Sequence, residues 1–115
     1  MRKTFGPLVL AAVLQAAAAH AHAQAPAGKA EDAKTKVSMC VGCHGIPAYK
    51  TAFPSVYHVP KIAGQSADYI VAALSAYKSG ERSHPTMQGI AKSLSEQDMA
   101  DLAAYYAAAT GGAPR

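Results

Sequence analysis

The sequence predicts an all-α fold in which three main helices are joined by long loops. Apolar residues recur at steps of three and four in three separate stretches, as they do along one face of a helix. No stretch shows the alternation of apolar and polar residues that marks a half-buried strand, so no sheet is expected. About 80 residues remain to fold once a removed N-terminal signal and flexible segments at both ends are set aside, and a core of this size often depends on a disulfide, a metal or a cofactor.

The N-terminus has the layout of a secretory signal peptide. Arg2 and Lys3 precede an apolar run over 5–19, and Ala21-His22-Ala23 is a small-x-small cleavage signal. An uncleaved anchor is the alternative, which the short apolar run disfavours. We therefore expect export to a periplasm and four segments: a removed signal peptide (1–23), a flexible leader (24–29), one domain (30–110) and a tail (111–115).

The charge of the chain argues against one class of partner. The formal net charge of +4 falls to +2 without the two signal cations, Arg2 and Lys3. The remaining lysines are scattered, and no basic cluster is interleaved with aromatic residues, so nucleic-acid binding is not expected. We expect the mature chain to have no transmembrane segment and to be a monomer.

The first main helix is expected over 30–40. Its apolar stripe recurs at steps of three, four and three residues: Ala30, Ala33, Val37 and Cys40. The first turn is acidic, as the helix dipole favours: Glu31 and Asp32. Gly45 and Pro47 would end any helical run soon after His44.

A long apolar loop is expected over 45–65. Its three prolines leave no room for a helix of ordinary length: Pro47, Pro54 and Pro60. Seven of its residues are nonetheless large and apolar: Ile46, Tyr49, Phe53, Val56, Tyr57, Val59 and Ile62. In a small domain such a loop should lie against something apolar, and a bound macrocycle is one candidate.

The second main helix is expected over 67–79. Ser66 is a good N-cap, and Gly80 stands where a left-handed residue ends many helices. Its apolar positions share one face: Ile70, Ala73, Leu74 and Tyr77.

The last third should hold one short helix and one main helix. Residues 80–87 form an irregular polar connection that ends on a methionine, and 88–94 form the short helix. Ser95 then caps the last main helix, 96–109, with Asp98 placed as in a capping box. One face of this helix is apolar: Met99, Leu102 and Tyr106.

The stretch Cys40-Val41-Gly42-Cys43-His44 decides the chemistry. Covalent haem attachment needs two thiols on one face of a helical turn, where they reach the vinyl groups, and an imidazole that reaches the iron from the same side. Cys-x-x-Cys-His supplies all three and is the sequence cue for a c-type haem. A second axial ligand must then come from a distant segment, because the ring lies between.

Other chemistries for the two cysteines fit less well. A four-cysteine zinc site is excluded by their number, and His58 and His84 have the wrong spacing for a Cys2His2 site. A thioredoxin-like pair expects a βαβ context, which is missing. A disulfide across two residues would close a very small loop and stabilise little. The sequence therefore favours one covalent haem, held by Cys40, Cys43 and His44.

Five side chains are candidates for the second axial position: Met39, Met87, Met99, His58 and His84. Met39 adjoins the first cysteine on the attachment side, and Met99 lies on an apolar helix face, as a core residue would. Met87 stands at the end of a polar loop, where an extended segment can lay a thioether over the ring. We expect Met87 to ligate, with His84 or His58 as alternatives, because Met/His and bis-His ligation both suit an electron-transfer haem.

With these residues in place, the chain resembles class I c-type cytochromes, in particular the cytochrome c553 and cytochrome c4 type. The matching motifs come in the family's order and cover nearly the whole mature chain: CVGCHG (40–45), PKIAGQ (60–65), GERSHPTM (80–87) and LSEQDMADLAAYY (94–106). The resemblance implies the class I cytochrome c fold, in which three main helices and long loops pack around one covalent haem c.

The resemblance also implies particular roles. Cys40 and Cys43 would form the thioethers, and His44 and Met87 would ligate the iron. The carbonyl of Pro60 would accept a hydrogen bond from the ligand histidine. The first and last helices would cross, with small residues against larger ones: Ala33 and Val37 on Leu102 and Tyr105.

From these features we expect a periplasmic one-electron carrier, and not an enzyme. Its iron would cycle between Fe(II) and Fe(III), and redox protein donors and acceptors would dock briefly at the haem edge. One alternative is a haem c subunit bound tightly to a periplasmic dehydrogenase or oxidase. Another is a peroxidase-like or ligand-sensing protein with an open sixth position.

Overall fold

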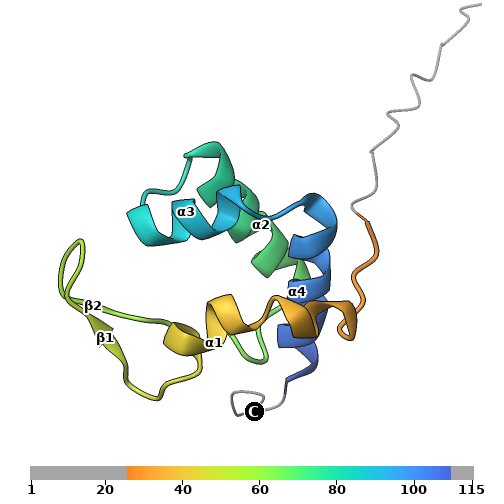
Figure 1. The fold of residues 1–115 in the computed structure, drawn as a ribbon, viewed down its shortest axis with the longest axis horizontal. Helices are drawn as coiled ribbons and strands as arrows, with labels where there is room; N and C mark the ends of the chain where they lie inside the picture. Colours follow the sequence, from red (N-terminus) through yellow and green to blue (C-terminus); the bar gives the residue numbers. More distant parts are fainter. Residues whose placement is uncertain (1–25, 110–115) are drawn as a thin grey trace, which may run out of the picture.

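The structure is a computed structural model that describes residues 26–109. In chain order its elements are η1 (a 3-10 helix, Asp32–Thr35), α1 (Ser38–His44), β1 (Lys50–Thr51), β2 (Tyr57–His58), α2 (Ala67–Ser79), α3 (Pro85–Lys92) and α4 (Glu96–Ala108). The all-α class is confirmed, and Figure 1 shows the two short strands extending to one side of the helices. The expected signal peptide and the tail lie outside the described residues.

The helices pack around one core. α2 lies against both α3 and α4, and η1 lies on α4. The buried apolar side chains form one cluster: Ala33, Ile70, Leu74, Ala91, Leu94, Met99, Leu102, Ala103 and Tyr106. Met99 is 1% exposed, so its assignment to the core is confirmed. Within 26–109, no helix is both long and apolar enough to cross a bilayer.

The two long helices begin and end on the expected signals. Ser66 caps α2 by accepting a hydrogen bond from the third residue of the helix, and Gly80 follows α2 in the left-handed region, with φ of 91°. Ser95 and Asp98 form a reciprocal capping box at the start of α4. Each cap satisfies backbone groups that the helix itself leaves unpaired.

The expected first helix is two shorter elements, so that prediction was wrong in its bounds. η1 covers only 32–35, and α1 then begins at Ser38 and carries the chain to His44. The predicted apolar stripe still faces inward: Ala33 is buried, and Val37 and Cys40 pack against the core. Periodicity identifies which face is apolar, but it does not separate one helix from two short ones that share a face. The expected crossing over the last helix is made by η1.

The expectation of no sheet was also wrong, though by little. β1 and β2 pair antiparallel, with Lys50 opposite His58 and Thr51 opposite Tyr57. Strands of two residues are too short to show alternation in the sequence. The apolar loop does not all lie against apolar surface, because the side chain of Phe53 is 68% exposed and that of Val56 is 77% exposed.

The short helix begins earlier than expected. α3 starts at Pro85, with His84 as its N-cap, so that Met87 lies in its first turn rather than in a loop. Proline is favoured in the first turn of a helix because its missing N–H would be unpaired there anyway.

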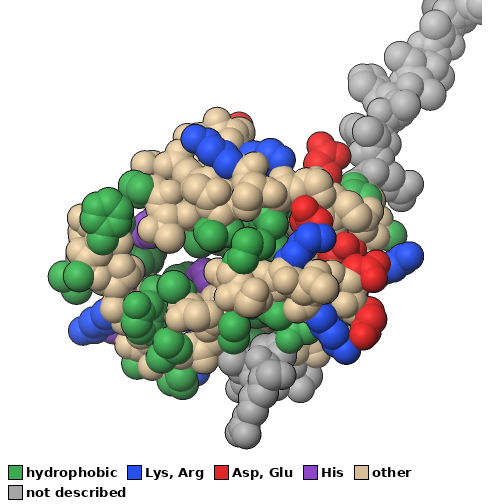
Figure 2. All heavy atoms as spheres, viewed as in Figure 1, with side chains coloured by type: hydrophobic (Ala, Val, Ile, Leu, Met, Phe, Trp, Pro, Cys, Tyr) green, Lys and Arg blue, Asp and Glu red, His purple; other side chains and the backbone are tan. Residues whose placement is uncertain are grey.

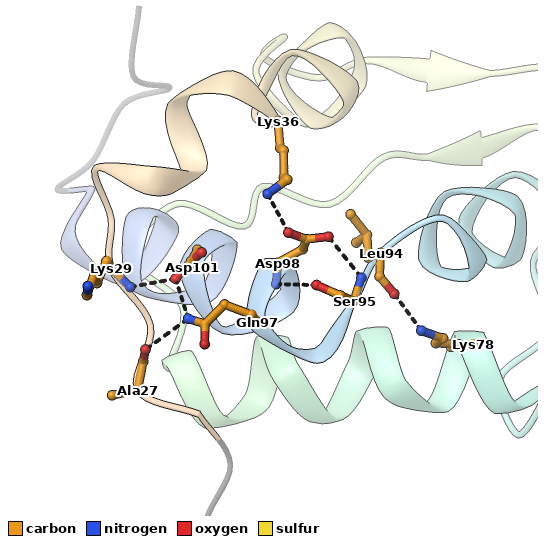
Figure 3. A network of polar contacts seen from close by, with 9 residues as sticks. All are labelled: Ala27, Lys29, Lys36, Lys78, Leu94, Ser95, Gln97, Asp98 and Asp101. Atoms are coloured by element: carbon orange, nitrogen blue, oxygen red, sulfur yellow. Dashed lines mark hydrogen bonds and ion pairs between the residues drawn. The ribbon is translucent and has the colours of Figure 1, made fainter.

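A polar network holds the N-terminal segment and η1 to α4 (Figure 3). The amide of Lys29 donates to Asp101 over 2.7 Å, and the Gln97 side chain donates to both Asp101 and the carbonyl of Ala27. Asp101 is 3% exposed, and the Lys29 amide is the main cause that lowers its pKa. The end of the expected flexible leader, 26–29, therefore lies along α4.

Candidate functional site

A cavity of about 320 Å3 opens between α1, the loop segment, α2, α3 and α4. Its volume lies within the range of about 300–1,000 Å3 typical of small-molecule and cofactor sites. Figure 2 shows the hollow, with hydrophobic and histidine side chains at its edge. Much of its wall is aliphatic: Ile62, Ile70, Leu74, Ile90 and Leu102. Such a wall suits a large apolar ligand.

One wall of the cavity carries the predicted attachment residues. Cys40, Cys43 and His44 all line it from α1, because one turn of this helix places residues three apart on the same face. Both thiols are free, Cys40 half-buried and Cys43 exposed. Burial raises the pKa of the Cys40 thiol, which therefore stays protonated more readily than an exposed cysteine.

His44 is anchored from outside its helix. Its Nδ1 lies 2.7 Å from the carbonyl oxygen of Pro60, and both residues line the cavity. Because a carbonyl only accepts, Nδ1 carries the proton of this hydrogen bond. In the neutral ring Nε2 is then the nitrogen without a proton, and this is the nitrogen that is free to bind a metal. The structure thus brings together the histidine and the carbonyl that the resemblance paired.

Met87 lines the cavity from α3, which lies across it from α1 (Figure 1). Its side chain is half-buried and packs against the core cluster. Its amide donates to Nδ1 of His84 over 3.4 Å, a long bond that belongs to the N-cap of α3. His84 also lines the cavity, but its Nδ1 is occupied by the cap at the start of α3. Because Met87 comes from α3 and His44 from α1, the thioether of Met87 lies across the cavity from His44.

The other candidate ligands are less well placed. His58 lies on β2, is exposed, and is not among the residues that line the cavity. Met39 lines the cavity, but it does so from α1, on the same side as the two cysteines. The structure therefore places Cys40, Cys43 and His44 on one side of the cavity and Met87 on another. The carbonyl of Pro60 holds the histidine ring from outside its helix.

Two residues at the site were missed from the sequence. The hydroxyl of Tyr106 is buried against the cavity without a hydrogen-bond partner among the described residues. Arg82 stands at the cavity with its guanidinium 4.8 Å from the ring centre of Tyr77 and bonded to the hydroxyl of Tyr69. The sequence holds only part of the signal for Tyr106: its place on an apolar helix face implies a buried hydroxyl that needs a partner, but the packing decides which group that hydroxyl meets.

The residues present fit a haem. The cavity offers an apolar wall for the macrocycle, two thiols for its edge, and nitrogen and sulfur donors on opposite sides for its iron. Within 26–109, no three histidine, cysteine or acidic side chains lie close enough to share a metal ion among themselves. The hydroxyl of Tyr106, which has no partner among the residues that the structure describes, is a further sign that a partner group belongs in this space.

Comparisons with known proteins agree with this chemistry. A family model described as "Cytochrome c" matches residues 30–108. The chain is 39% identical over 83 residues to cytochrome c-554(548) of Halomonas halodenitrificans, which covers 70% of this chain and 95% of that protein. It is 38% identical over 89 residues to cytochrome c4 of Pseudomonas aeruginosa, which covers 77% of this chain and 40% of that protein.

A third relative is a protein of Stutzerimonas stutzeri described as a thiosulfate dehydrogenase electron acceptor. The identity is 40% over 65 residues, which covers 56% of this chain and 29% of that protein. The chain therefore spans nearly all of the Halomonas protein but less than half of the other two.

Proposed function

The chain belongs to the cytochrome c family, as a class I c-type cytochrome with covalently attached haem c, and on that premise we propose that it is a periplasmic one-electron carrier whose iron is held between His44 and Met87. The role of electron carrier follows from the family. The ligands, the attachment residues and the compartment are our proposal.

One observation supports the ligand assignment above all others. The imidazole of His44, fixed by Pro60, and the thioether of Met87 approach one cavity from different helices. When bound there, haem c takes up and gives back one electron at its iron, between Fe(III) and Fe(II). The chain itself would bind this group in a fixed orientation and shield it from water.

Each residue has a separate share in this task. Cys40 and Cys43 fix the edge of the macrocycle from α1, and Pro60 fixes the ring of His44 and increases its basicity. Met87 supplies a weaker donor than a second histidine would. Together with the aliphatic wall, Met/His ligation raises the reduction potential relative to bis-His ligation. If His44 and Met87 both ligate the iron, no position would remain for a substrate, so we infer a carrier and not an enzyme.

The proposed compartment and partners follow from the signal-peptide prediction and from the role of electron carrier. The first 23 residues support export, and a c-type cytochrome then works in the periplasm. Redox protein donors and acceptors would meet it in brief encounters over a small area, as is typical of electron transfer. We infer that the mature chain acts as a monomer.

Fractionation together with redox titration tests this proposal. The protein from the periplasmic fraction should begin near Gln24, should keep its haem after acid–acetone extraction, and should titrate reversibly with one electron. A protein retained in the cytoplasm with an intact signal peptide, or one that loses its haem on extraction, would contradict the proposal.

A second candidate function has one observation in its favour. The tip between β1 and β2 exposes large apolar groups, with the side chain of Phe53 68% exposed and that of Val56 77% exposed. Figure 2 shows hydrophobic side chains at this end of the molecule and acidic ones at the other. Exposed apolar patches are typical of interfaces. This favours a haem c subunit held tightly by a periplasmic dehydrogenase or oxidase.

The free carrier and the bound subunit differ in the role of the apolar tip between β1 and β2, which would contact a partner enzyme only in the bound subunit. If the chain is a bound subunit, it should co-purify in fixed stoichiometry with a larger redox enzyme, and Phe53→Ser with Val56→Ser should release it. If it is a free carrier, it should elute as a small protein with or without these changes.

A further inference from the structure

Tyr106 places a buried hydroxyl at the cavity without a partner in the described part of the chain. Its side chain is 3% exposed, comes from α4, and forms part of the cavity wall. The Oη atom is shielded from water and has no hydrogen-bond partner within 26–109. Buried polar groups in folded proteins are almost always paired, so an unpaired one calls for a specific explanation.

Cys40 is a polar neighbour of this hydroxyl, because it packs against the core cluster that contains Tyr106 and lines the same cavity. Burial, followed by the charge that Cys40 carries when ionised, raises the pKa of Tyr106 well above its ordinary value of 10.0. The phenol therefore remains protonated at any pH the protein meets, and it keeps a proton to donate. Burial is the main cause that raises the pKa of the Cys40 thiol, and the Tyr106 hydroxyl is near enough to act on it as a donor that lowers this pKa by less. By distance and angle, however, the two groups do not form a hydrogen bond.

We propose that Tyr106 donates a hydrogen bond to the thioether sulfur that Cys40 forms with the haem, and thereby raises the reduction potential of this cytochrome. This inference rests on the proposed attachment at Cys40. A thiol sulfur can donate its own proton as well as accept weakly, whereas a thioether sulfur only accepts. Attachment thus leaves the neighbour of Tyr106 with acceptor capacity alone, which suits a hydroxyl that keeps its proton.

The direction of the effect follows from charge. A donor aimed at the sulfur withdraws electron density from the edge of the macrocycle, which favours the electron-rich reduced state. Hydrogen bonds to sulfur and burial are recognised controls on the potential of iron cofactors. The proton stays on Tyr106 in both oxidation states, and only one electron moves. Tyr106 is therefore a tuning residue and takes no part in the transfer itself.

The neighbouring tyrosine provides a matched control. Tyr105 packs edge-on against Tyr106, with ring centres 5.4 Å apart, but it is not among the residues that line the cavity. Tyr106→Phe and Tyr105→Phe each remove one hydroxyl from the same helix and leave the rings in place. Any change in general packing or in α4 should appear in both variants.

Redox titration of the holoprotein and its two variants tests the proposal. Tyr106→Phe should lower the equilibrium constant for reduction by up to about tenfold, because the full worth of one hydrogen bond limits the difference that it can make between the two oxidation states, and tenfold corresponds to about 59 mV for one electron. Tyr105→Phe should leave it unchanged. Equal potentials in Tyr106→Phe and the wild type, or equal shifts in both variants, would overturn the proposal.

Proton NMR of the reduced wild-type protein gives a readout that needs no variant. The Tyr106 hydroxyl proton should exchange slowly and show a nuclear Overhauser contact to the β-protons of Cys40. Rapid exchange with water would overturn the hydrogen bond alone. Loss of the haem on acid–acetone extraction would overturn this proposal and the proposed attachment together, so the two failures are distinguishable.

Discussion

The Nδ1 nitrogen of His44 lies 2.7 Å from the carbonyl oxygen of Pro60, although 16 positions separate the two residues. The segment after Pro60 is itself pinned, because the amide of Gly64 donates to the carbonyl of Tyr106 over 2.8 Å. The orientation of the imidazole is therefore fixed by α4 through the loop, and not by α1 alone.

Pro60→Gly should raise the reduction potential. Glycine keeps the carbonyl but frees the φ angle that proline fixes, so the acceptor is held less firmly. A weaker hydrogen bond makes His44 a poorer donor to the iron, which disfavours the oxidised state. Redox titration measures the shift, and Pro47→Gly, at an exposed proline outside the cavity, is the control. A lower potential in Pro60→Gly, or the same shift in both variants, would contradict this role.

Asp98→Asn should destabilise the fold only above acidic pH. Lys36 first, and the capping bond from the Ser95 amide second, lower the pKa of Asp98 from 3.8 to about 2. A carboxylate with a lowered pKa stabilises the fold above its unfolded value and loses that effect as the pH falls through its folded value. At pH 7 the variant should lose about 0.2–1 kcal/mol of unfolding free energy, as for a surface ion pair.

Denaturant titration at several pH values checks this window. The difference between wild type and Asp98→Asn should shrink below pH 3.8, be small at pH 2 and approach zero below it. Glu96→Gln removes an exposed acid from the same turn without touching the capping box. A loss in Asp98→Asn that is the same at pH 7 and pH 2 would show that the charge is not responsible.

Gly28→Ala should destabilise the protein, whereas Gly89→Ala should stabilise it. A Cβ at Gly28 would lie 1.9 Å from the carbonyl oxygen of Ala100 in α4, and this backbone cannot move aside without disturbing the helix. We expect a loss of about 1–3 kcal/mol, as in other overpacked sites. Gly89 lies inside α3, and apart from its chain neighbours and the backbone of its own helix no atom lies within 4 Å of the added methyl. Alanine there should raise the free energy of unfolding by about 0.5–1 kcal/mol.

Thermal unfolding of the holoproteins measures both changes. Opposite signs are the informative result, since the two substitutions add the same methyl group. If Gly28→Ala proved neutral, segment 26–29 would not lie as closely against α4 as its contacts indicate.

The sequence predicts those parts of the fold whose signals are local. α2 begins and ends where Ser66 and Gly80 indicated, and α4 begins at the predicted capping box and ends one residue early. Capping uses side chains within a few residues of the helix end, so it can be read without the tertiary structure. The attachment motif is local in the same way, because its three residues fall on one helical turn.

The parts that the sequence did not predict depend on contacts between distant residues. The sequence predicts a loop at Pro85, although this residue starts α3, and the pairing of β1 with β2 leaves no pattern in two-residue strands. The unpaired hydroxyl of Tyr106 becomes visible only once α4 is placed beside Cys40. Periodicity shows on which face of a helix a residue lies, but it does not show which residues from other elements pack against that face.

The absorption spectrum of the oxidised holoprotein tests the central claim, that Met87 and His44 together hold the iron. Sulfur-to-iron ligation gives a charge-transfer band at the far-red edge. Met87→Ala should abolish this band and open the iron to carbon monoxide in the reduced state. Met39→Ala, which removes a thioether from the attachment side of the same cavity, should keep the band. An unchanged six-coordinate spectrum in Met87→Ala would contradict the account.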